Sequence, residues 1–309
     1  MTANFMLVSD DKYTKNLGIC TYSVLHNMCP AVEHVRIFVM DCGITEENKA
    51  KLRRQAARFD NAELVFHNIE QQLDEVSTQV ETHWHKAIYG RLFFPELLAK
   101  YDNMARLIYL DCDLLMNQPV TELFEMDLQG KCLAGIADSY SYARKLALGI
   151  DMDCTYINSG VLVIDTARWT ALNASKNIIA YLNSFPEKLI YPDQDAINAV
   201  LAHEILILHP RYNFMWQICQ NDIPKMLRSI DHFYYSAEEL SEGLQDAAIY
   251  HYAGHDMWTI DGLTPVHTDV FRKYRRLCDW RDCRRHFSSI RNGVLWLMID
   301  IKRKLLGIR

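Results

Sequence analysis

One apolar segment that ends in two closely spaced carboxylates constrains the fold of this chain more than any other stretch. Residues 107–110 form a continuous hydrophobic run, and Asp111 and Asp113 follow it. A short run of this kind is typical of a strand that is covered on both faces. In an extended chain the two carboxylates point the same way, one pleat apart. The segment therefore predicts a buried strand that ends in a pair of acids.

Segments typical of strands and helices alternate along residues 1 to about 210, which predicts an α/β domain with a mainly parallel sheet. We expect strands at 5–8, 35–40, 64–66, 107–110, 132–137, 160–164 and 205–208, and helices at 16–28 and 87–98. Thr45 is expected to cap a further helix, whose acids precede its basic residues in the order that the helix dipole favours. The sequence contains neither GxGxxG nor GxxxxGK[ST], which argues against a dinucleotide fold and a P-loop.

Composition favours an intracellular globular protein. The chain has 309 residues, of which 50% are hydrophobic, enough for one large or two modest domains. Its beginning does not resemble a signal peptide, and no apolar run approaches the roughly 20 residues that cross a bilayer. The nine cysteines show no CxxC pair and no spacing typical of a metal cluster, so we expect reduced thiols that serve mostly as small core residues. These features predict a cytoplasmic location.

The C-terminal segment differs in charge from the rest of the chain. Residues 268–309 carry a net charge of +8 and residues 1–267 one of −14, for a total of −6. Aromatic residues such as Trp280, Phe287 and Trp296 lie among the basic ones, a combination that favours an anionic membrane surface over nucleic acid. We expect a main domain at 1–267 and a helical membrane-association segment at 268–309. The alternative is that this segment packs on the acidic body as an ordinary helix.

Several acids are expected to meet at one edge of the sheet. In open α/β sheets ligands bind beyond the carboxyl ends of the strands, where Asp10, Asp11 and Asp113 would converge. Carboxylate oxygens suit Mn²⁺ or Mg²⁺, whose remaining positions are commonly filled by water and substrate phosphates. The segment IYHYAGHDMW offers His251 as a third ligand. The alternative for the paired acids is a solvated turn.

Seven motifs in order make the chain similar to glycosyltransferase family 8, which includes bacterial lipopolysaccharide α-galactosyl- and α-glucosyltransferases and glycogenin. They are VSDDKY, YGRLFFPELL, YLDCDLL, YINSGVLVID, YPDQDAIN, RYNFMW and HYAG. The resemblance implies the nucleotide-diphospho-sugar transferase fold (glycosyltransferase A type). It also implies UDP-galactose or UDP-glucose as donor, Mn²⁺ with Mg²⁺ as a substitute, and transfer with retention to a saccharide or glycolipid acceptor. Such a role places the protein on the cytoplasmic face of the membrane, in lipopolysaccharide or other cell-surface glycan synthesis.

The resemblance also assigns the residues that hold the donor. The metal ligands would be Asp111, Asp113 and His251. Asp10 would contact uracil, and Tyr13 would stack on it. The remaining donor-binding positions would be Ser9, Lys12, Arg91, Cys112, Asn158, Gly254 and Met257. For Arg91 the alternative is a structural ion pair with Glu96.

Three residues match the positions around the reacting sugar: Asp138, Asp193 and Gln194. Gln194 matches the residue beneath the anomeric carbon, where a neutral amide is a poor nucleophile. This favours front-face attack, in which the leaving phosphate accepts the acceptor's proton, over double displacement. The alternative for Asp193 is a simple helix N-cap.

Two departures from the family pattern bear on the function. Met257 stands where the family has a lysine that meets the diphosphate, and Lys12 stands where asparagine is common. A catalytically weak or silent nucleotide-sugar-binding protein is therefore one alternative. The others are a phosphatase of the haloacid dehalogenase type, with Asp111 as nucleophile, and a nucleotidyltransferase.

Overall fold

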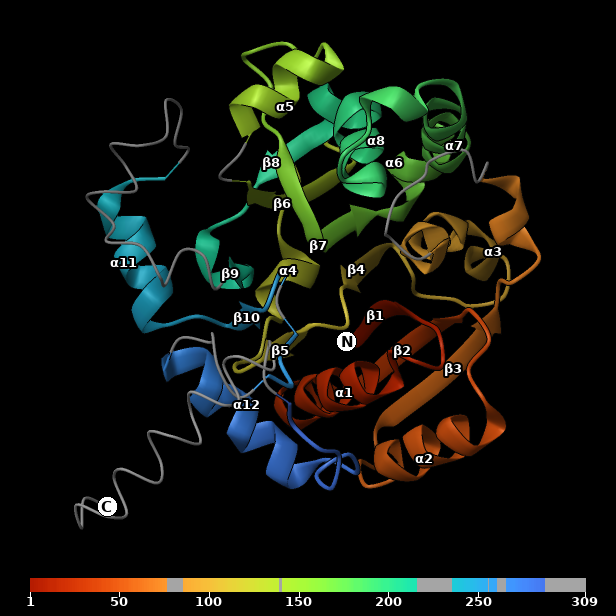
Figure 1. Ribbon diagram of the computed structural model, residues 1–309, viewed down its shortest axis with the longest axis vertical. Coiled ribbons are helices and arrows are strands. Elements are labelled where there is room, and N and C mark those ends of the chain that lie inside the picture. Colours follow the sequence, from red (N-terminus) through yellow and green to blue (C-terminus); the bar gives the residue numbers. More distant parts are fainter. Residues whose placement is uncertain (77–85, 139–140, 216–234, 255, 260–264, 287–309) are drawn as a thin grey trace.

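The computed structural model describes residues 1–76, 86–138, 141–215, 235–254, 256–259 and 265–286. A seven-stranded sheet runs through its centre in the order β3-β2-β1-β4-β7-β6-β8 (Figure 1). Its strands are β1 (Thr2–Ser9), β2 (His34–Asp41), β3 (Ala62–Asn68), β4 (Arg106–Leu110), β6 (Leu133–Ala137), β7 (Ile157–Asp165) and β8 (Ile205–Ile207). β7 runs antiparallel to both neighbours, and the other pairs are parallel. The expected mainly parallel sheet is confirmed.

Helices cover both faces of this sheet, because its strands are apolar on both sides. Phe5 and Leu7 of β1 pack into one core cluster, together with residues of α1, α2 and α12. Met6 and Val8 point the other way, into a second cluster with residues of α6, α7 and α8. The helices are α1 (Thr14–Met28), α2 (Glu46–Ala56), α3 (Pro95–Leu98), α4 (Glu122–Glu125), α5 (Ser141–Leu148), α6 (Thr166–Ala171), α7 (Ala174–Ser184), α8 (Pro192–Leu201), α11 (Ala237–Gln245) and α12 (Pro265–Leu277).

The structure departs from the expected elements in two places. The helix expected at 87–98 is a 3₁₀ segment, η2 (Lys86–Phe93), followed by the single turn α3, which begins at Pro95. Proline lacks the N–H that would continue one regular helix across this point. A small second sheet, in the order β5-β10-β9, was not expected; its strands are β5 (Leu114–Met116), β9 (Phe214–Met215) and β10 (Ile249–His251). Four further 3₁₀ segments are η1 (Gln72–Glu75), η3 (Pro186–Lys188), η4 (Ala202–Glu204) and η5 (Pro210–Tyr212).

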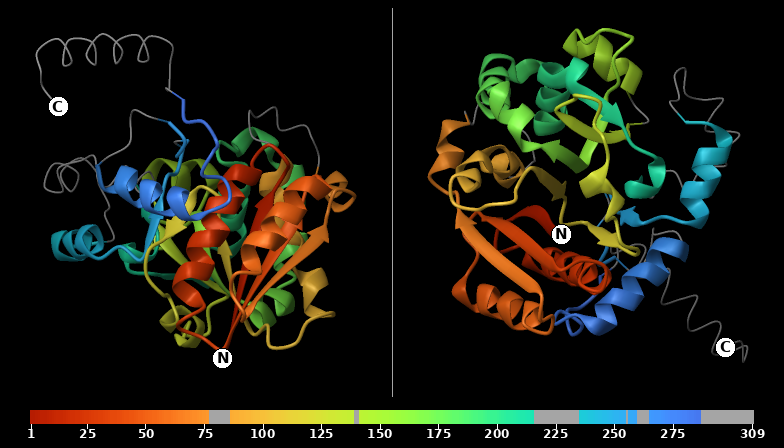
Figure 2. Two further views of the ribbon diagram at one scale, coloured as in Figure 1. Left: turned by 90° about the horizontal axis from the view of Figure 1, so that it is seen from below. Right: turned by 180° about the vertical axis from the view of Figure 1, so that it is seen from behind.

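Much of the basic C-terminal segment belongs to the body of the protein. α12 lies beside α1, as both views of Figure 2 show, so the expected boundary after residue 267 falls inside a packed helix. Trp280, which we expected at a membrane surface, is only 3% exposed, and Lys51 lies 4.5 Å above its ring. This part of the segment therefore follows the alternative of a helix docked on the acidic body. Phe287 and Trp296 lie outside the described residues.

No helix in the part of the chain that the structure describes is long and apolar enough to cross a membrane.

The contact between α1 and Trp280 predicts that replacing Gly18 by alanine destabilises the fold. A Cβ atom at this position would lie 2.2 Å from the Trp280 ring, too close for any carbon contact. Gly18→Ala should therefore lower the free energy of unfolding by about 1–3 kcal/mol. Helix propensity alone predicts the opposite sign, a gain of about 1 kcal/mol. Urea unfolding decides between them, and the loss should shrink in a Trp280→Leu background; a stabilised Gly18→Ala protein would contradict the packing.

Candidate active site

A cavity of about 490 Å³ opens at the carboxyl ends of the parallel strands. β1 and β4 are parallel neighbours, so Asp10 and Asp111 follow strands that end at the same edge. β7 runs the other way, and its first residues, including Asn158, reach this edge from the opposite direction. Every donor-site or reacting-centre residue named from the sequence lines the cavity except Met257. The topology thus collects residues from seven separate segments.

Two carboxylates and one imidazole form a compact group on the floor of the cavity. Nε2 of His251 lies 3.3 Å from Asp113 Oδ1 and 3.9 Å from Asp111 Oδ2. One ligand atom from each residue lies within 4.8 Å of the others. Asp111 and Asp113 lie in the short connection between β4 and β5, and β10, which carries His251, pairs with β5. The donor set and its spacing fit one divalent cation that keeps positions for substrate oxygens.

Asn213, which was not among the residues expected in the site, fixes the imidazole of His251. Its side-chain oxygen accepts a hydrogen bond from Nδ1 of His251 at 2.8 Å, which leaves the lone pair of Nε2 directed at the carboxylates. The amide of Asn213 also donates to Asn158 Oδ1 at 2.9 Å. Asn213 lies in the RYNFMW motif, but its partner is reached only through the pairing of β9 with β10. This second layer prepares His251 as a ligand.

Arg91 lies almost fully buried between two acids. Its guanidinium is 2.9 Å from Asp111 Oδ1 and 3.0 Å from Asp193 Oδ2, and it donates to the Ser159 carbonyl at 2.8 Å. It also stacks 4.0 Å above the ring of Tyr109, whose hydroxyl donates to the same oxygen of Asp111 at 2.5 Å. These bonds occupy Oδ1 of Asp111 and turn Oδ2 toward His251.

The alternative for Arg91, a structural ion pair with Glu96, is wrong. Glu96 instead contacts His67 at 3.0 Å and Gln72. The alternative role of Asp193 as an N-cap is also wrong, because Tyr191 occupies the cap position of α8 and has no capping bond from its side chain. Asp195, not Asp193, accepts the backbone N–H groups of Ile190 and Tyr191 at the start of this helix.

The acids give the cavity a negative electrostatic environment. Burial lowers the pKa of His251, but the carboxylates of Asp113 and Asp111 outweigh burial, so the net pKa lies above its ordinary value. Burial raises the pKa of Asp193 and exceeds the opposing effect of the Arg91 guanidinium. The raised pKa of His251 reflects the negative charge of Asp113 and Asp111, whereas the raised pKa of Asp193 reflects mainly its burial. A cation bound beside Asp111 would offset the charge of Asp113 and Asp111.

Gln194 lines the same cavity and is fixed by hydrogen bonds to both the nitrogen and the oxygen of its amide. Nε2 donates to Asp138 at 3.1 Å and to the Tyr156 hydroxyl at 3.0 Å. Oε1 accepts from the Ser159 N–H at 3.0 Å and from Asn158 at 3.2 Å. The amide therefore has one defined orientation, as a group that positions a substrate requires.

Asp195 holds Tyr156, a hydrogen-bond partner of Gln194, in place. This role was not expected from the sequence. Asp195 is fully buried and bonded at both oxygens to Arg144, at 3.0 and 2.6 Å, and it accepts the hydroxyl hydrogen of Tyr156 at 2.7 Å. The carboxylate thus links α5 and the residue before β7 to α8, next to Gln194. The YPDQDAIN motif could not predict the burial of Asp195, because it contains three polar residues in a row and does not distinguish among them.

The mouth of the cavity carries the residues at the end of β1. Tyr13 is 41% exposed, which leaves an aromatic surface accessible, and its N–H donates to Asp10 at 2.9 Å. Asp11 does not converge with these residues as expected. Its carboxylate caps the start of α2 instead, with bonds from Thr45 and Asn48 that lower its pKa, the bond from Asn48 contributing most.

In the HYAGHDMW segment, Met257 lies away from the cavity, whereas Gly254 lines it as expected. Met257 is fully buried in the core cluster and does not line the cavity, so it makes no contact there in place of a lysine. Gly254 lines the cavity, and its φ of +71° is a left-handed conformation that favours glycine. His255 lies outside the described residues.

Comparison with known proteins agrees with this architecture. The model of glycosyl transferase family 8 matches residues 4–257. General stress protein A of Bacillus subtilis (strain 168) is 28% identical over 276 residues, which cover 88% of this chain and 92% of that protein. The lipopolysaccharide 1,2-glucosyltransferase of Escherichia coli (strain K12) is 30% identical over 138 residues, 44% of this chain and 40% of that protein. The crystal structure of galactosyltransferase LgtC with donor and acceptor sugar analogs has a TM-score of 0.73 at 23% identity, over 90% of this chain and 96% of that one.

The bond between Asn213 and His251 predicts a loss of metal affinity without a change of ligand. Asn213→Ala removes the acceptor that fixes the tautomer of His251, so Mn²⁺ affinity should fall roughly 10–100-fold. Titration followed by the electron paramagnetic resonance of free Mn²⁺ measures this. Asn27→Ala, which removes an amide bonded to the Ser23 and Met116 carbonyls away from the cavity, is the matched control and should leave affinity unchanged. Equal affinity in both variants would contradict the role of Asn213.

Proposed function

Because the chain belongs to glycosyltransferase family 8, we propose that it is a retaining hexosyltransferase that moves galactose or glucose from UDP to a saccharide acceptor, with Mn²⁺ as its cation. The single observation that carries this proposal is the convergence of Asp111, Asp113 and His251 in one cavity with Gln194. The first three suit a metal-bound diphosphate, and the fourth suits the sugar attached to it.

The nucleotide would lie at the mouth of the cavity. The exposed ring of Tyr13 provides a stacking surface for uracil, with Asp10 beside it. Ser9 and Lys12 line the same region, and Cys112 lies between the two metal ligands. Lys12 brings a positive charge to this wall, where the family pattern has asparagine. Stacking together with polar contacts at the base edge accounts for recognition of the nucleoside.

The diphosphate would lie between the acids and Arg91. When bound, Mn²⁺ supplies positive charge that stabilises the developing negative charge on the leaving diphosphate. The carboxylates of Asp111 and Asp113 and Nε2 of His251 hold the cation, and Arg91 keeps Asp111 in a single orientation. Gly254 provides backbone without a side chain where the chain borders the cavity.

The transferred sugar would lie against Asn158, Asp138, Asp193 and Gln194. The amide of Gln194 is neutral and held by four hydrogen bonds, so it is suited to position the sugar and to stabilise an oxocarbenium-like state. It is not suited to form a covalent intermediate. This supports front-face transfer, in which the acceptor hydroxyl attacks from the side that UDP leaves and its proton passes to the leaving phosphate oxygen.

Membership of the family leaves the phosphatase and nucleotidyltransferase alternatives without support. A silent nucleotide-sugar-binding protein differs from the proposed transferase only in turnover. Arg91 and Gln194 are both present in the cavity and held by hydrogen bonds to Ser159, which favours an active enzyme.

Release of UDP tests the proposed activity directly. With Mn²⁺ and a panel of UDP-sugars, the protein should hydrolyse UDP-galactose or UDP-glucose slowly without acceptor. Asp113→Ala should lower this turnover roughly 100-fold or more, because it removes a ligand of the charge-stabilising cation. Asp11→Asn, an acid two residues beyond β1 that caps α2, is the control and should remain active. Unchanged turnover in Asp113→Ala would refute the metal assignment, and no turnover with any donor would favour the silent protein.

We also propose that residues 287–309 bring the enzyme to the cytoplasmic face of an anionic membrane, where a lipid-linked acceptor would be found. This stretch keeps Phe287 and Trp296 among basic residues, whereas Trp280 is buried in the body. The membrane role is therefore narrowed to the part of the segment after residue 286.

Deletion of residues 287–309 should weaken binding to anionic liposomes while hydrolysis of a soluble UDP-sugar continues, because the deletion removes the basic aromatic stretch and keeps α12 and Trp280. Cosedimentation with anionic and with neutral liposomes measures the effect. If the truncated protein binds anionic liposomes as well as the full chain does, the proposed membrane role of this stretch fails.

A further inference from the structure

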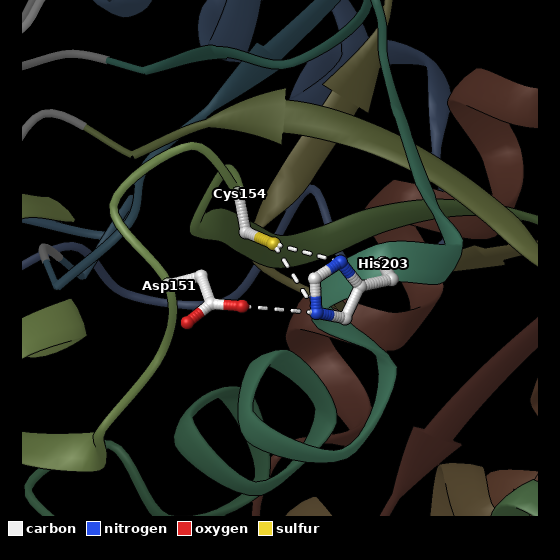
Figure 3. A group of neighbouring side chains, drawn as sticks. All are labelled: Asp151, Cys154 and His203. Carbon is white, nitrogen blue, oxygen red and sulfur yellow. Dashed lines mark hydrogen bonds and ion pairs between the residues drawn. The ribbon is translucent and has the colours of Figure 1, made fainter.

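A second group of metal-ligating side chains lies outside the active-site cavity. Asp151 and Cys154 lie in the loop between α5 and β7, and His203 lies in η4, directly after α8 (Figure 3). Cys154 and His203 are 49 positions apart, so cysteine spacing could not reveal the group. The fold alone brings the three side chains together.

The geometry fits a single cation. Nε2 of His203 lies 3.8 Å from the Cys154 sulfur and 3.3 Å from Asp151 Oδ2, and the three ligand atoms lie within 4.8 Å of one another. Tetrahedral zinc, with Zn–S of about 2.3 Å and Zn–N or Zn–O of about 2.0–2.1 Å, separates sulfur from nitrogen by roughly 3.6 Å and nitrogen from oxygen by roughly 3.3 Å. The two distances from Nε2 are close to these edges, and the sulfur also lies 3.3 Å from Nδ1 of the same ring.

The backbone on both sides of the group is anchored. Nζ of Lys145 donates to the carbonyls of Met152 and Cys154 at 2.9 Å each, which fixes the loop. Nζ of Lys131 donates to the carbonyl of His203 at 2.7 Å, which fixes η4. A cation would therefore be bound by two segments that are already held in place, and would require little ordering of the backbone.

We propose that Asp151, Cys154 and His203 form a binding site for Zn²⁺ or a similar transition metal, separate from the Mn²⁺ site of the cavity. A thiolate and an imidazole select such metals, whereas two carboxylates and one imidazole suit the harder Mn²⁺ or Mg²⁺. The side chains of Asp151 and His203 are 73% and 74% exposed, so the metal can enter from solvent, and water can fill a fourth position.

The same three side chains also have the order of a nucleophilic triad, with the Cys154 thiol 3.3 Å from Nδ1 of His203 and Asp151 at Nε2. The burial of the thiol disfavours that function, because a bulky substrate cannot approach it. Reactive cysteines lie in partly exposed places.

A metal at this site would join the loop before β7, which carries Asp151 and Cys154, to η4, which carries His203. His203 follows the end of α8, and Cys154 precedes Tyr156, whose hydroxyl bonds to both Gln194 and Asp195. A ligand that binds only the folded state raises thermal stability. Zn²⁺ should therefore raise the melting temperature of the full chain, and this rise should be lost with Cys154.

Co²⁺ is the best probe, because a thiolate ligand gives a near-ultraviolet charge-transfer band that oxygen and nitrogen ligands do not. The titration uses the full-length Asp113→Ala protein, in which the active-site cation site is disabled, so its outcome does not depend on the transferase activity. We expect the band at one equivalent of Co²⁺ and its displacement by Zn²⁺. Cys154→Ala should abolish the band, and Cys29→Ala, which removes a cysteine from the end of α1, should keep it.

A second variant keeps the test decisive if the buried Cys154→Ala substitution harms folding. His203 is largely exposed, so His203→Ala should leave the fold intact and weaken Co²⁺ binding at least about tenfold. Absence of the band in the Asp113→Ala protein, or a band that persists with full affinity in His203→Ala, would overturn the proposal.

Discussion

The active-site cavity depends on one buried cation, the guanidinium of Arg91. Asp111 and Asp193 are brought within 3.0 Å of it, at the edge where Asp113 also lies. Acids gathered in a partly desolvated place destabilise a fold unless opposite charge is built in. Arg91 provides that charge, and it also joins η2 to β4, β7 and α8 through its four partners. The fold can therefore hold paired carboxylates ready for a metal.

A chain of amides connects the metal end of the cavity with the sugar end. His251 is fixed by Asn213, Asn213 donates to Asn158, and Asn158 donates to Gln194. Asp195 and Tyr156 support Gln194 from behind. These groups lie on β10, on the residue before β9, on β7 and on α8, and Tyr156 immediately precedes β7. The placement of Gln194 relative to the His251 group thus follows from the junction of the two sheets with α8.

The sequence was sufficient for the central sheet and for most residues of the cavity, because apolar runs that end in acids mark buried strands and their carboxyl ends. It was insufficient wherever a role depends on distant neighbours. Asn213 acquires its role through the pairing of β9 with β10, and Trp280 is buried because Gly18 leaves space on α1. Asp11 resembles a site residue in sequence but caps a helix. Local pattern carries no information on such contacts, which arise only when the chain is folded.

Pulsed electron paramagnetic resonance of the Mn²⁺-loaded protein with UDP tests the central claim most directly, because it identifies the nuclei bound to the metal. The proposed function predicts coupling of Mn²⁺ to one histidine nitrogen and to phosphorus of UDP. The nitrogen coupling should disappear in His251→Gln and persist in His203→Gln, since the second histidine lies at the separate thiolate site. A wild-type spectrum with oxygen ligands alone, or a nitrogen coupling that survives in His251→Gln, would contradict the assignment of this cavity as a nucleotide-sugar site with its own metal.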